Sequence, residues 1–139
     1  MKVPLVLELF ADPAARGAGL SDRRSLPFAV DGAAFLFEGP QPPSTVLWNR
    51  ATYLPLDLLF VGQDARVLAL VTMRTIEESG GTIECYASPA PFAIALELVR
   101  GRAAALGIVV GSSVSLVPVR GKPYVVAIAI TSGPLRRSM

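Results

Sequence analysis

The chain has 139 residues, of which 52% are apolar and only 17% are charged, and its 13 Lys and Arg exceed its 11 Asp and Glu by a net charge of +2. This length suits one domain, which can bury about two-thirds of its unfolded surface without metals or disulfides. The arginines are scattered rather than gathered in a stripe with aromatic residues, so we expect no nucleic-acid partner.

Missing residue types narrow the chemistry further. The chain has no histidine, which excludes Ser-His-Asp, Cys-His and His-based zinc sites. Its single cysteine, Cys85, can form neither an internal disulfide nor a Cys-rich zinc site, and we expect a buried, unreactive thiol. The carboxylates are spread singly apart from Glu77-Glu78, so we expect no metal site and no cofactor.

Short apolar runs argue against a membrane span. The longest, residues 54–61 and 124–130, fall far short of the about 20 residues that a spanning helix needs. The apolar stretch after Lys2 is also too short for a signal peptide. We therefore expect no transmembrane segment. The sequence leaves the location open: the cytoplasm, or outside it if an export signal was removed. The low charged fraction is compatible with a homodimer.

Strand, turn and helix patterns follow one another from the first residues. Residues 3–9 alternate in polarity, with the period of two that is typical of a half-buried strand. Asp12-Pro13 reads as an N-cap and a first-turn proline, which predicts a short helix over residues 14–18 ending at Gly19. A second short helix is predicted over residues 102–106, with Gly107 as its left-handed stop. Further strands are predicted over residues 33–38, 45–48, 56–61, 66–73, 82–86, 92–98, 114–119 and 124–130.

Turn signals separate these strands at intervals of about 8–12 residues, the spacing of antiparallel sandwiches and barrels. We predict a mainly β fold for residues 1–139: a single antiparallel β-sandwich or barrel-like domain of about eight or nine strands with one or two short helices. A final hairpin strand lies within residues 123–131. One alternative predicts that this apolar strand lies at a sheet edge, where it could pair with another chain.

The densest group of polar and aromatic side chains lies in residues 48–60, a turn that leads into an apolar strand. Binding groups often lie on such loops. Trp48 is expected to be a large core residue at one end of the domain, and the alternative is a stacking platform for a ligand ring. Asp57 must be hydrogen-bonded if it is buried. It either locks the turn at residues 51–54 through backbone N–H groups or serves as a ligand anchor or general base with Arg50 or Arg23.

Two further groups are candidates. Arg23 either clamps an anionic ligand or pairs with Asp57 or Glu97 to hold loops together. Glu84, Tyr86 and Ser88 alternate along one predicted strand and so share a face, which is either the polar floor of a ligand site or a solvated surface.

Five groups of residues are informative because of the order in which they follow one another along the chain: Arg16, Gly19, Leu20, Arg23 and Leu26; Gly32, Phe35 and Phe37; Trp48, Thr52, Pro55, Leu56 and Asp57; Tyr86 and Ser88; Leu96, Glu97, Leu98 and Gly111. In this order they resemble the pattern of the DUF192 family of small bacterial and archaeal proteins, over residues 3–118. The resemblance implies a mostly β, sandwich- or barrel-like fold, with export signals in many relatives and no established activity. Ser21, Asn49, Ala51 and Ser112 stand where the family pattern carries Met, Met, Asn and Asp.

These observations predict a binding module rather than an enzyme. The expected ligand is small, with a saccharide or an envelope component as the first candidates. We assign no catalytic residue and no metal ligand, and the expected ligand-binding residues are Arg23, Trp48, Arg50, Tyr53, Asp57, Glu84, Tyr86 and Ser88. Two alternatives remain: a hydrolase or transferase that uses the carboxylates of Asp57 and Glu84, and a structural or interaction protein that pairs through its edge strand.

Overall fold

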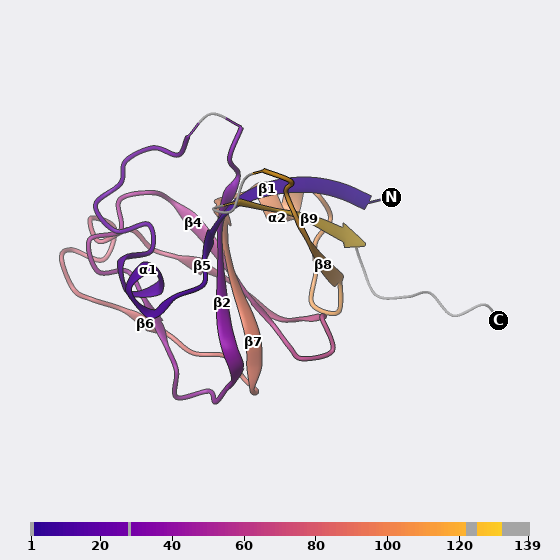
Figure 1. Ribbon diagram of the computed structural model, residues 1–139. Helices are drawn as coiled ribbons and strands as arrows, with labels where there is room; N and C mark the ends of the chain where they lie inside the picture. Colours follow the sequence, from indigo (N-terminus) through magenta and orange to yellow (C-terminus); the bar gives the residue numbers. More distant parts are fainter. Residues whose placement is uncertain (1, 28, 122–124, 132–139) are drawn as a thin grey trace.

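The computed structural model describes residues 2–27, 29–121 and 125–131, and it is mainly β, as predicted (Figure 1). One seven-stranded sheet has the order β5-β4-β7-β2-β1-β9-β8. Its strands are β1 (Lys2–Phe10), β2 (Gly32–Gln41), β4 (Leu56–Val61), β5 (Val67–Met73), β7 (Phe92–Val99), β8 (Ser113–Pro118) and β9 (Val125–Thr131). A second sheet pairs β3 (Leu47–Trp48) with β6 (Cys85–Tyr86), and the helices are α1 (Pro13–Ala18) and α2 (Arg102–Ala105).

The large sheet curls until its two outer strands meet near one end. An isolated antiparallel bridge joins Arg66, just before β5, to Ser113 at the start of β8. On either side of it, the N–H of Val67 donates to the carbonyl of Ser112 at 2.9 Å and the N–H of Val114 donates to that of Ala65 at 2.8 Å. The sheet is therefore a partly closed barrel, and this contact covers part of both edges.

The predicted edge position of the last strand is wrong. β9 lies between β1 and β8 and pairs antiparallel with both. β9 pairs with the N-terminal strand β1 on one side and with β8 on the other, so neither of its edges is left for another chain. Tyr124, the first residue of the predicted strand, lies outside the described residues.

One strand pair departs from the predicted antiparallel pattern. β1 and β2 run parallel, whereas every other described pair in both sheets is antiparallel. Parallel neighbours need a long crossover connection rather than a tight turn. Here the crossover is residues 11–31, which contain α1.

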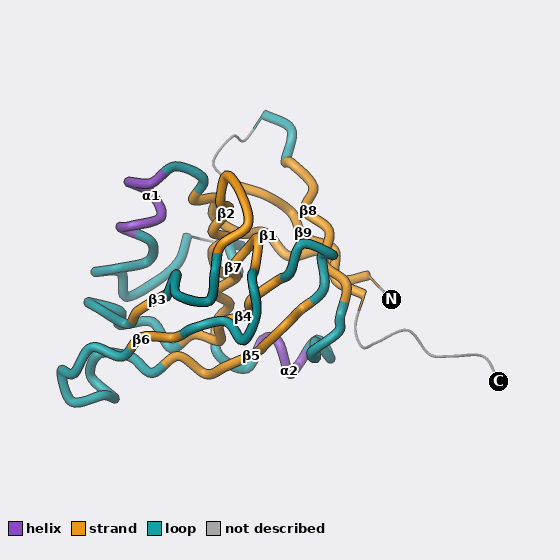
Figure 2. Tube along the Cα trace, turned by 90° about the horizontal axis from the view of Figure 1, so that it is seen from below, coloured by secondary structure: helices purple, strands orange, loops and turns teal. Residues whose placement is uncertain are grey.

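Two apolar clusters lie on the two faces of the curled sheet. The inner face, inside the barrel, carries Leu7, Leu59 and Leu96, and Ala103 of α2 packs against the same cluster. The outer face carries a second cluster in which Phe35, Leu58, Phe60 and Phe92 are buried. α1 and the β3–β6 pair gather on one side of the molecule (Figures 1 and 2). Every residue of β4 is buried, so this strand is covered on both faces.

The start and the end of α1 agree with the prediction from the sequence. Asp12 accepts the N–H of Ala15 at 2.8 Å, Pro13 occupies the first turn, and α1 ends before Gly19 at φ +50°. The small sheet is shorter than predicted, with two residues per strand instead of residues 45–48 and 82–86. The reason is local: the N–H of Glu84 is bonded to the Asn49 side chain at 2.7 Å instead of to a strand carbonyl.

Candidate functional site

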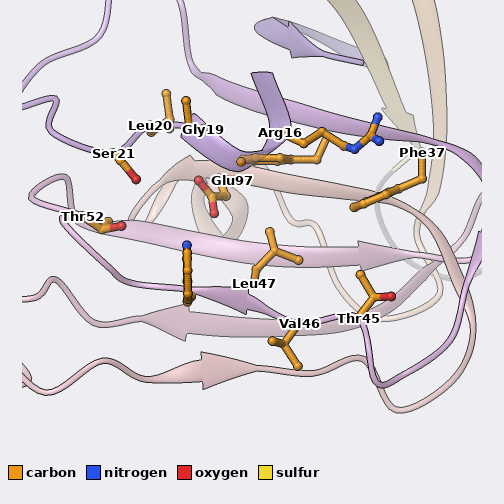
Figure 3. Close-up of a pocket in the computed structure, with 14 residues that line it drawn as sticks. Arg16, Gly19, Leu20, Ser21, Phe37, Thr45, Val46, Leu47, Thr52 and Glu97 are labelled. Carbon is orange, nitrogen blue, oxygen red and sulfur yellow. The ribbon is translucent and has the colours of Figure 1, made fainter. Parts of the chain in front are cut away.

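A pocket of about 340 Å³ lies on the outer face of the sheet, and we call it the Trp48–Glu97 pocket (Figure 3). This volume lies within the range of about 300–1,000 Å³ that is usual for small-molecule sites. Its lining comes from α1 and the following loop, β2, the β3 region, the next turn and β7: Arg16, Gly17, Ala18, Gly19, Leu20, Ser21, Phe35, Phe37, Thr45, Val46, Leu47, Trp48, Thr52 and Glu97. Most of this surface is apolar, with few polar groups.

Arg16 and Gly19 shape the wall contributed by the crossover. The Arg16 guanidinium lies 5.0 Å from the Phe37 ring centroid and donates to the carbonyls of Ala11 at 2.6 Å and Leu36 at 2.9 Å. These contacts fix α1 against β2. A Cβ at Gly19 would lie 3.1 Å from a carbon of the Phe35 ring, and its positive φ also favours glycine. Gly19 therefore lets the loop pass close to the aromatic wall.

The loop after α1 is tied to the turn that follows Trp48. The Ser21 hydroxyl donates to the carbonyl of Arg50 at 3.2 Å, and the N–H of Asp22 donates to the carbonyl of Ala51 at 2.8 Å. Two segments about 30 residues apart in the sequence thus form one rim. Ala51 has φ +50°, a conformation that non-glycine residues rarely adopt, although Asn adopts it more readily.

Trp48 is not the buried core residue that we expected. Its exposed fraction is 45%, because β3 is a two-residue strand that only partly covers the sheet. The indole lines the Trp48–Glu97 pocket and also an adjoining, more polar hollow of about 410 Å³ that contains Asp22 and Arg50. The Arg50 guanidinium carbon lies 5.5 Å from the indole ring centroid, a cation–π contact that occupies one face of the ring.

Asn49 anchors this turn from below and is fully buried. Its backbone N–H donates to the carbonyl of Glu84 at 3.1 Å, and its side-chain oxygen accepts the N–H of Glu84 at 2.7 Å. Its amide nitrogen donates to the carbonyl of Arg74 at 3.2 Å and to the Ser79 hydroxyl at 3.0 Å. A residue that looked only like a departure from the family pattern therefore joins three loops.

Glu97 is the buried carboxyl of the pocket, with an exposed fraction of only 5%. It comes from β7, where its register neighbours on the outer face are Leu58 of β4 and Ala33 of β2. No hydrogen bond or ion pair from the described residues reaches its carboxyl group. Burial in these apolar surroundings raises its pKa to about 8. Figure 3 shows the carboxyl between the segment of Gly19, Leu20 and Ser21 and the side chain of Leu47.

Asp57 lies on the other face of the sheet. It alternates with Leu58 and so shares the inner face with Leu59, and its exposed fraction is 6%. Its carboxylate accepts the N–H of Gly101, the residue that precedes α2, at 2.8 Å. Asp57 therefore does lock a loop, but the loop is the one before α2 and not the predicted turn at residues 51–54. The inward direction of its side chain is the reason.

Glu84 and Tyr86 do share a face, in a surface cluster with Arg74. Arg74 binds Glu84 with its shortest contact at 2.6 Å, and Tyr86 donates its hydroxyl to Glu84 at 2.9 Å. The hydrogen bonds from Arg74 and then from Tyr86 lower the pKa of Glu84. Ser88 stands apart, buried and bonded to the carbonyl of Ala90 at 2.6 Å. Cys85 is exposed on the two-residue strand β6, contrary to our expectation of a buried thiol.

The two other predicted site residues make local contacts. Arg23 forms an ion pair with Glu8 of β1, and neither Asp57 nor Glu97 is its partner. Tyr53 lies under Arg24, whose guanidinium carbon is 4.1 Å from the ring centroid. Of the eight predicted ligand-binding residues, the Trp48–Glu97 pocket takes in only Trp48, and Arg50 lies in the adjoining hollow.

Sequence reasoning missed Glu97 as a site residue. Its alternation with Leu96 and Leu98 reads as the solvated face of a strand, and nothing local shows that a second layer covers that face. Over the described part of the chain, no group of three or more Cys, Asp or Glu side chains lies close enough together to hold a metal ion. Within the same residues, no helix has the length and apolar character needed to cross a membrane.

Comparisons with known proteins agree with this fold. The model of the DUF192 family, described as "Uncharacterized ACR", matches residues 2–116. A crystal structure from Sinorhizobium meliloti 1021, described as that of a proposed transcription regulator, is 32% identical, with a TM-score of 0.66 over 77% of this chain and 78% of that chain. A protein of unknown function from Novosphingobium aromaticivorans DSM 12444 is 28% identical, with a TM-score of 0.65 over 81% of this chain and 83% of that chain. No curated protein matches significantly. The family match covers most of the sequence, and the chain therefore belongs to the DUF192 family.

Proposed function

We propose that this protein is a non-enzymatic module that binds a small organic ligand in the Trp48–Glu97 pocket. The observation that carries the proposal is the buried carboxyl of Glu97, which faces a cavity of about 340 Å³ without a partner among the described residues. The Glu97 carboxyl opens on a cavity that is otherwise mostly apolar, and it carries both donor and acceptor capacity when it is protonated. A ligand with a complementary polar group could use this capacity.

The walls favour a ligand with an apolar ring. Phe35, Phe37 and Leu47 line the cavity, and polar lining groups are few. A saccharide, or the sugar part of an envelope component, could stack one face on Trp48. Its many hydroxyls would need more polar partners than this lining offers, so an aromatic or alicyclic compound is the better fit.

The alternative of a carboxylate-dependent hydrolase has less support. Neither Asp57 nor Glu84 lines the Trp48–Glu97 pocket. Asp57 is bonded to Gly101, and Glu84 is held by Arg74 at the surface. The two carboxylates proposed from the sequence are thus engaged in separate structural roles.

Trp48 provides a direct test, because it is the only tryptophan of the chain. A library of small ring compounds, monosaccharides and anions would be titrated while following its fluorescence and its single indole N–H signal in 15N NMR spectra. We expect saturable changes with at least one ring compound. If no compound changes either signal at millimolar concentration, the proposal fails.

A matched pair of variants locates the binding. Val46 lines the pocket with an exposed fraction of 45%, whereas Val117 on β8 is 53% exposed and does not line it. Val46→Phe adds a ring at the pocket wall and should weaken binding. Val117→Phe adds the same ring elsewhere and should leave it unchanged. Equal effects of both substitutions would place the binding outside the Trp48–Glu97 pocket.

A further inference from the structure

The side chains around Glu97 indicate the chemistry of the ligand. It is flanked in the sheet by Leu58 and Ala33, neither of which has a polar side chain. The nearest charged residue on the same face of the strands is Glu8 on β1, across Ala33, and it is paired with Arg23. Nothing that the structure describes thus neutralises an ionised carboxylate at this position.

The two cations near the pocket are also engaged. Arg16 of α1 donates to the carbonyls of Ala11 and Leu36 and lies over Phe37. Arg50, from the turn after β3, lies over the indole of Trp48. Neither forms an ion pair with Glu97, so both remain positive charges beside the cavity.

Two features act against a cationic ligand. An ammonium group would share the pocket with Arg16, and Arg50, in the adjoining hollow, already occupies one indole face, on which a cation could otherwise bind. It would also require Glu97 to ionise in apolar surroundings, which burial opposes. A protonated carboxyl, by contrast, has one O–H donor to offer. A neutral ligand with a hydrogen-bond acceptor fits both conditions.

We infer that Glu97 acts as a neutral acid that donates its proton in a hydrogen bond to a carbonyl, ether or ring-nitrogen acceptor of an uncharged ring compound bound in the Trp48–Glu97 pocket. The inference rests on the proposed function and names the class of its ligand. Because burial raises the pKa of the unliganded Glu97 carboxyl to about 8, the donor is present at neutral pH.

Three compounds of similar size separate the possibilities: acetophenone, with a carbonyl acceptor; benzamidine, which is a cation at all three pH values; and ethylbenzene, with neither group. Their dissociation constants would be measured at pH 6, 7 and 9.5 from the indole N–H signal of Trp48. We expect acetophenone to bind more tightly than the other two at pH 6. Between pH 7 and 9.5 its affinity should fall by about threefold to tenfold, since ionised Glu97 no longer donates and one hydrogen bond contributes about 0.5–1.5 kcal/mol.

Two variants add a readout that does not depend on the pH titration alone. Glu97→Gln keeps a donor that does not ionise, and it should bind acetophenone with little change between pH 7 and 9.5. Glu97→Leu should remove the preference for acetophenone over ethylbenzene. If a variant does not fold, the titration of the unaltered protein still decides the question.

The outcomes are distinct. Preference for benzamidine, with affinity that rises toward high pH, would overturn the inference and leave a cation-binding pocket. Binding of acetophenone without any effect of pH or of Glu97→Leu would also overturn it, while the proposed function stands. Failure of all three compounds and of the wider library to bind at any pH would remove the proposed function itself.

Discussion

The side chain of Asn49 accepts the backbone N–H of Glu84 at 2.7 Å, while the backbone N–H of Asn49 donates to the carbonyl of Glu84 at 3.1 Å. The two residues hold the β3 and β6 segments together where regular pairing stops. The same Asn49 side chain also reaches the carbonyl of Arg74 and the hydroxyl of Ser79. The position of Trp48, its neighbour in the chain, depends on this buried joint.

Replacing Asn49 by Leu should lower the free energy of unfolding by about 3 kcal/mol or more, because several buried polar groups would lose their partner at once. Urea unfolding would measure the loss, and the fluorescence of Trp48 should report a less fixed indole. Gln41→Leu serves as a control, since Gln41 is only partly buried and its amide nitrogen bonds locally to Gly39 at 3.1 Å. An equal loss in both variants would contradict the central role of Asn49.

Substitutions of Ala51, unlike that of Asn49, should stabilise the protein. Its φ of +50° is costly for alanine, so Ala51→Gly should raise the free energy of unfolding by about 0.5–1 kcal/mol. Ala51→Asn, which restores the residue of the family pattern, should also stabilise, because Asn tolerates this conformation. Ala14→Gly in α1 is the matched control and should destabilise by about 0.5–1 kcal/mol. Thermal unfolding of the three variants would show whether each substitution raises or lowers the stability of the protein.

The raised pKa of Glu97 predicts how the free energy of unfolding depends on pH. The folded protein holds a proton up to about pH 8 that the unfolded chain, with an ordinary pKa of 4.5, has already released. Stability should therefore fall as the pH rises from about 4.5 to about 8 and level off above that range.

Glu97→Gln should remove this dependence and raise the free energy of unfolding at pH 8 by about 2–4 kcal/mol. Near pH 4.5 the two proteins should differ little. Glu38→Gln is the control at an exposed carboxylate and should leave the pH profile unchanged. A profile of Glu97→Gln that parallels that of the unaltered protein would show that Glu97 is not buried in its neutral form.

Glu78 should show the reverse dependence. Its hydrogen bond with Arg100, at 2.7 Å, and that with the N–H of Thr75, at 2.8 Å, lower its pKa from 4.5 to about 2. The stabilisation is complete above pH 4.5 and is lost as the pH falls through about 2. Glu78→Gln should therefore destabilise the protein at pH 7 and have little effect near pH 2. Glu77→Gln, at the exposed neighbouring position, should have little effect at either pH.

Local patterns predicted most of the elements, because their signals are local. Asp12-Pro13 gave the start of α1, and the alternation around Ile94 and Leu96 gave β7. The neighbours of each strand depend on the whole chain, so the parallel pair β1–β2 and the position of β9 between β1 and β8 were not predicted.

The candidate site shows the same limit. Asp57 drew attention because it interrupts an apolar run, yet β4 is buried on both faces and its side chain points into the barrel. Glu97 looked like an ordinary solvated residue. Only the crossover and the β3 segment, packed over the outer face, turn that position into the floor of a cavity. The Trp48 indole was expected to need burial, but the brevity of β3 leaves it half open.

The parallel direction of β1 and β2 has an evolutionary consequence. Parallel neighbours need a crossover connection, which here is about 20 residues long between β1 and β2. Part of this crossover forms the roof over Glu97. Substitutions in this roof would change the shape of the Trp48–Glu97 pocket without breaking a single ladder bond of the barrel. Related sequences can therefore vary the pocket while they inherit the same sheet.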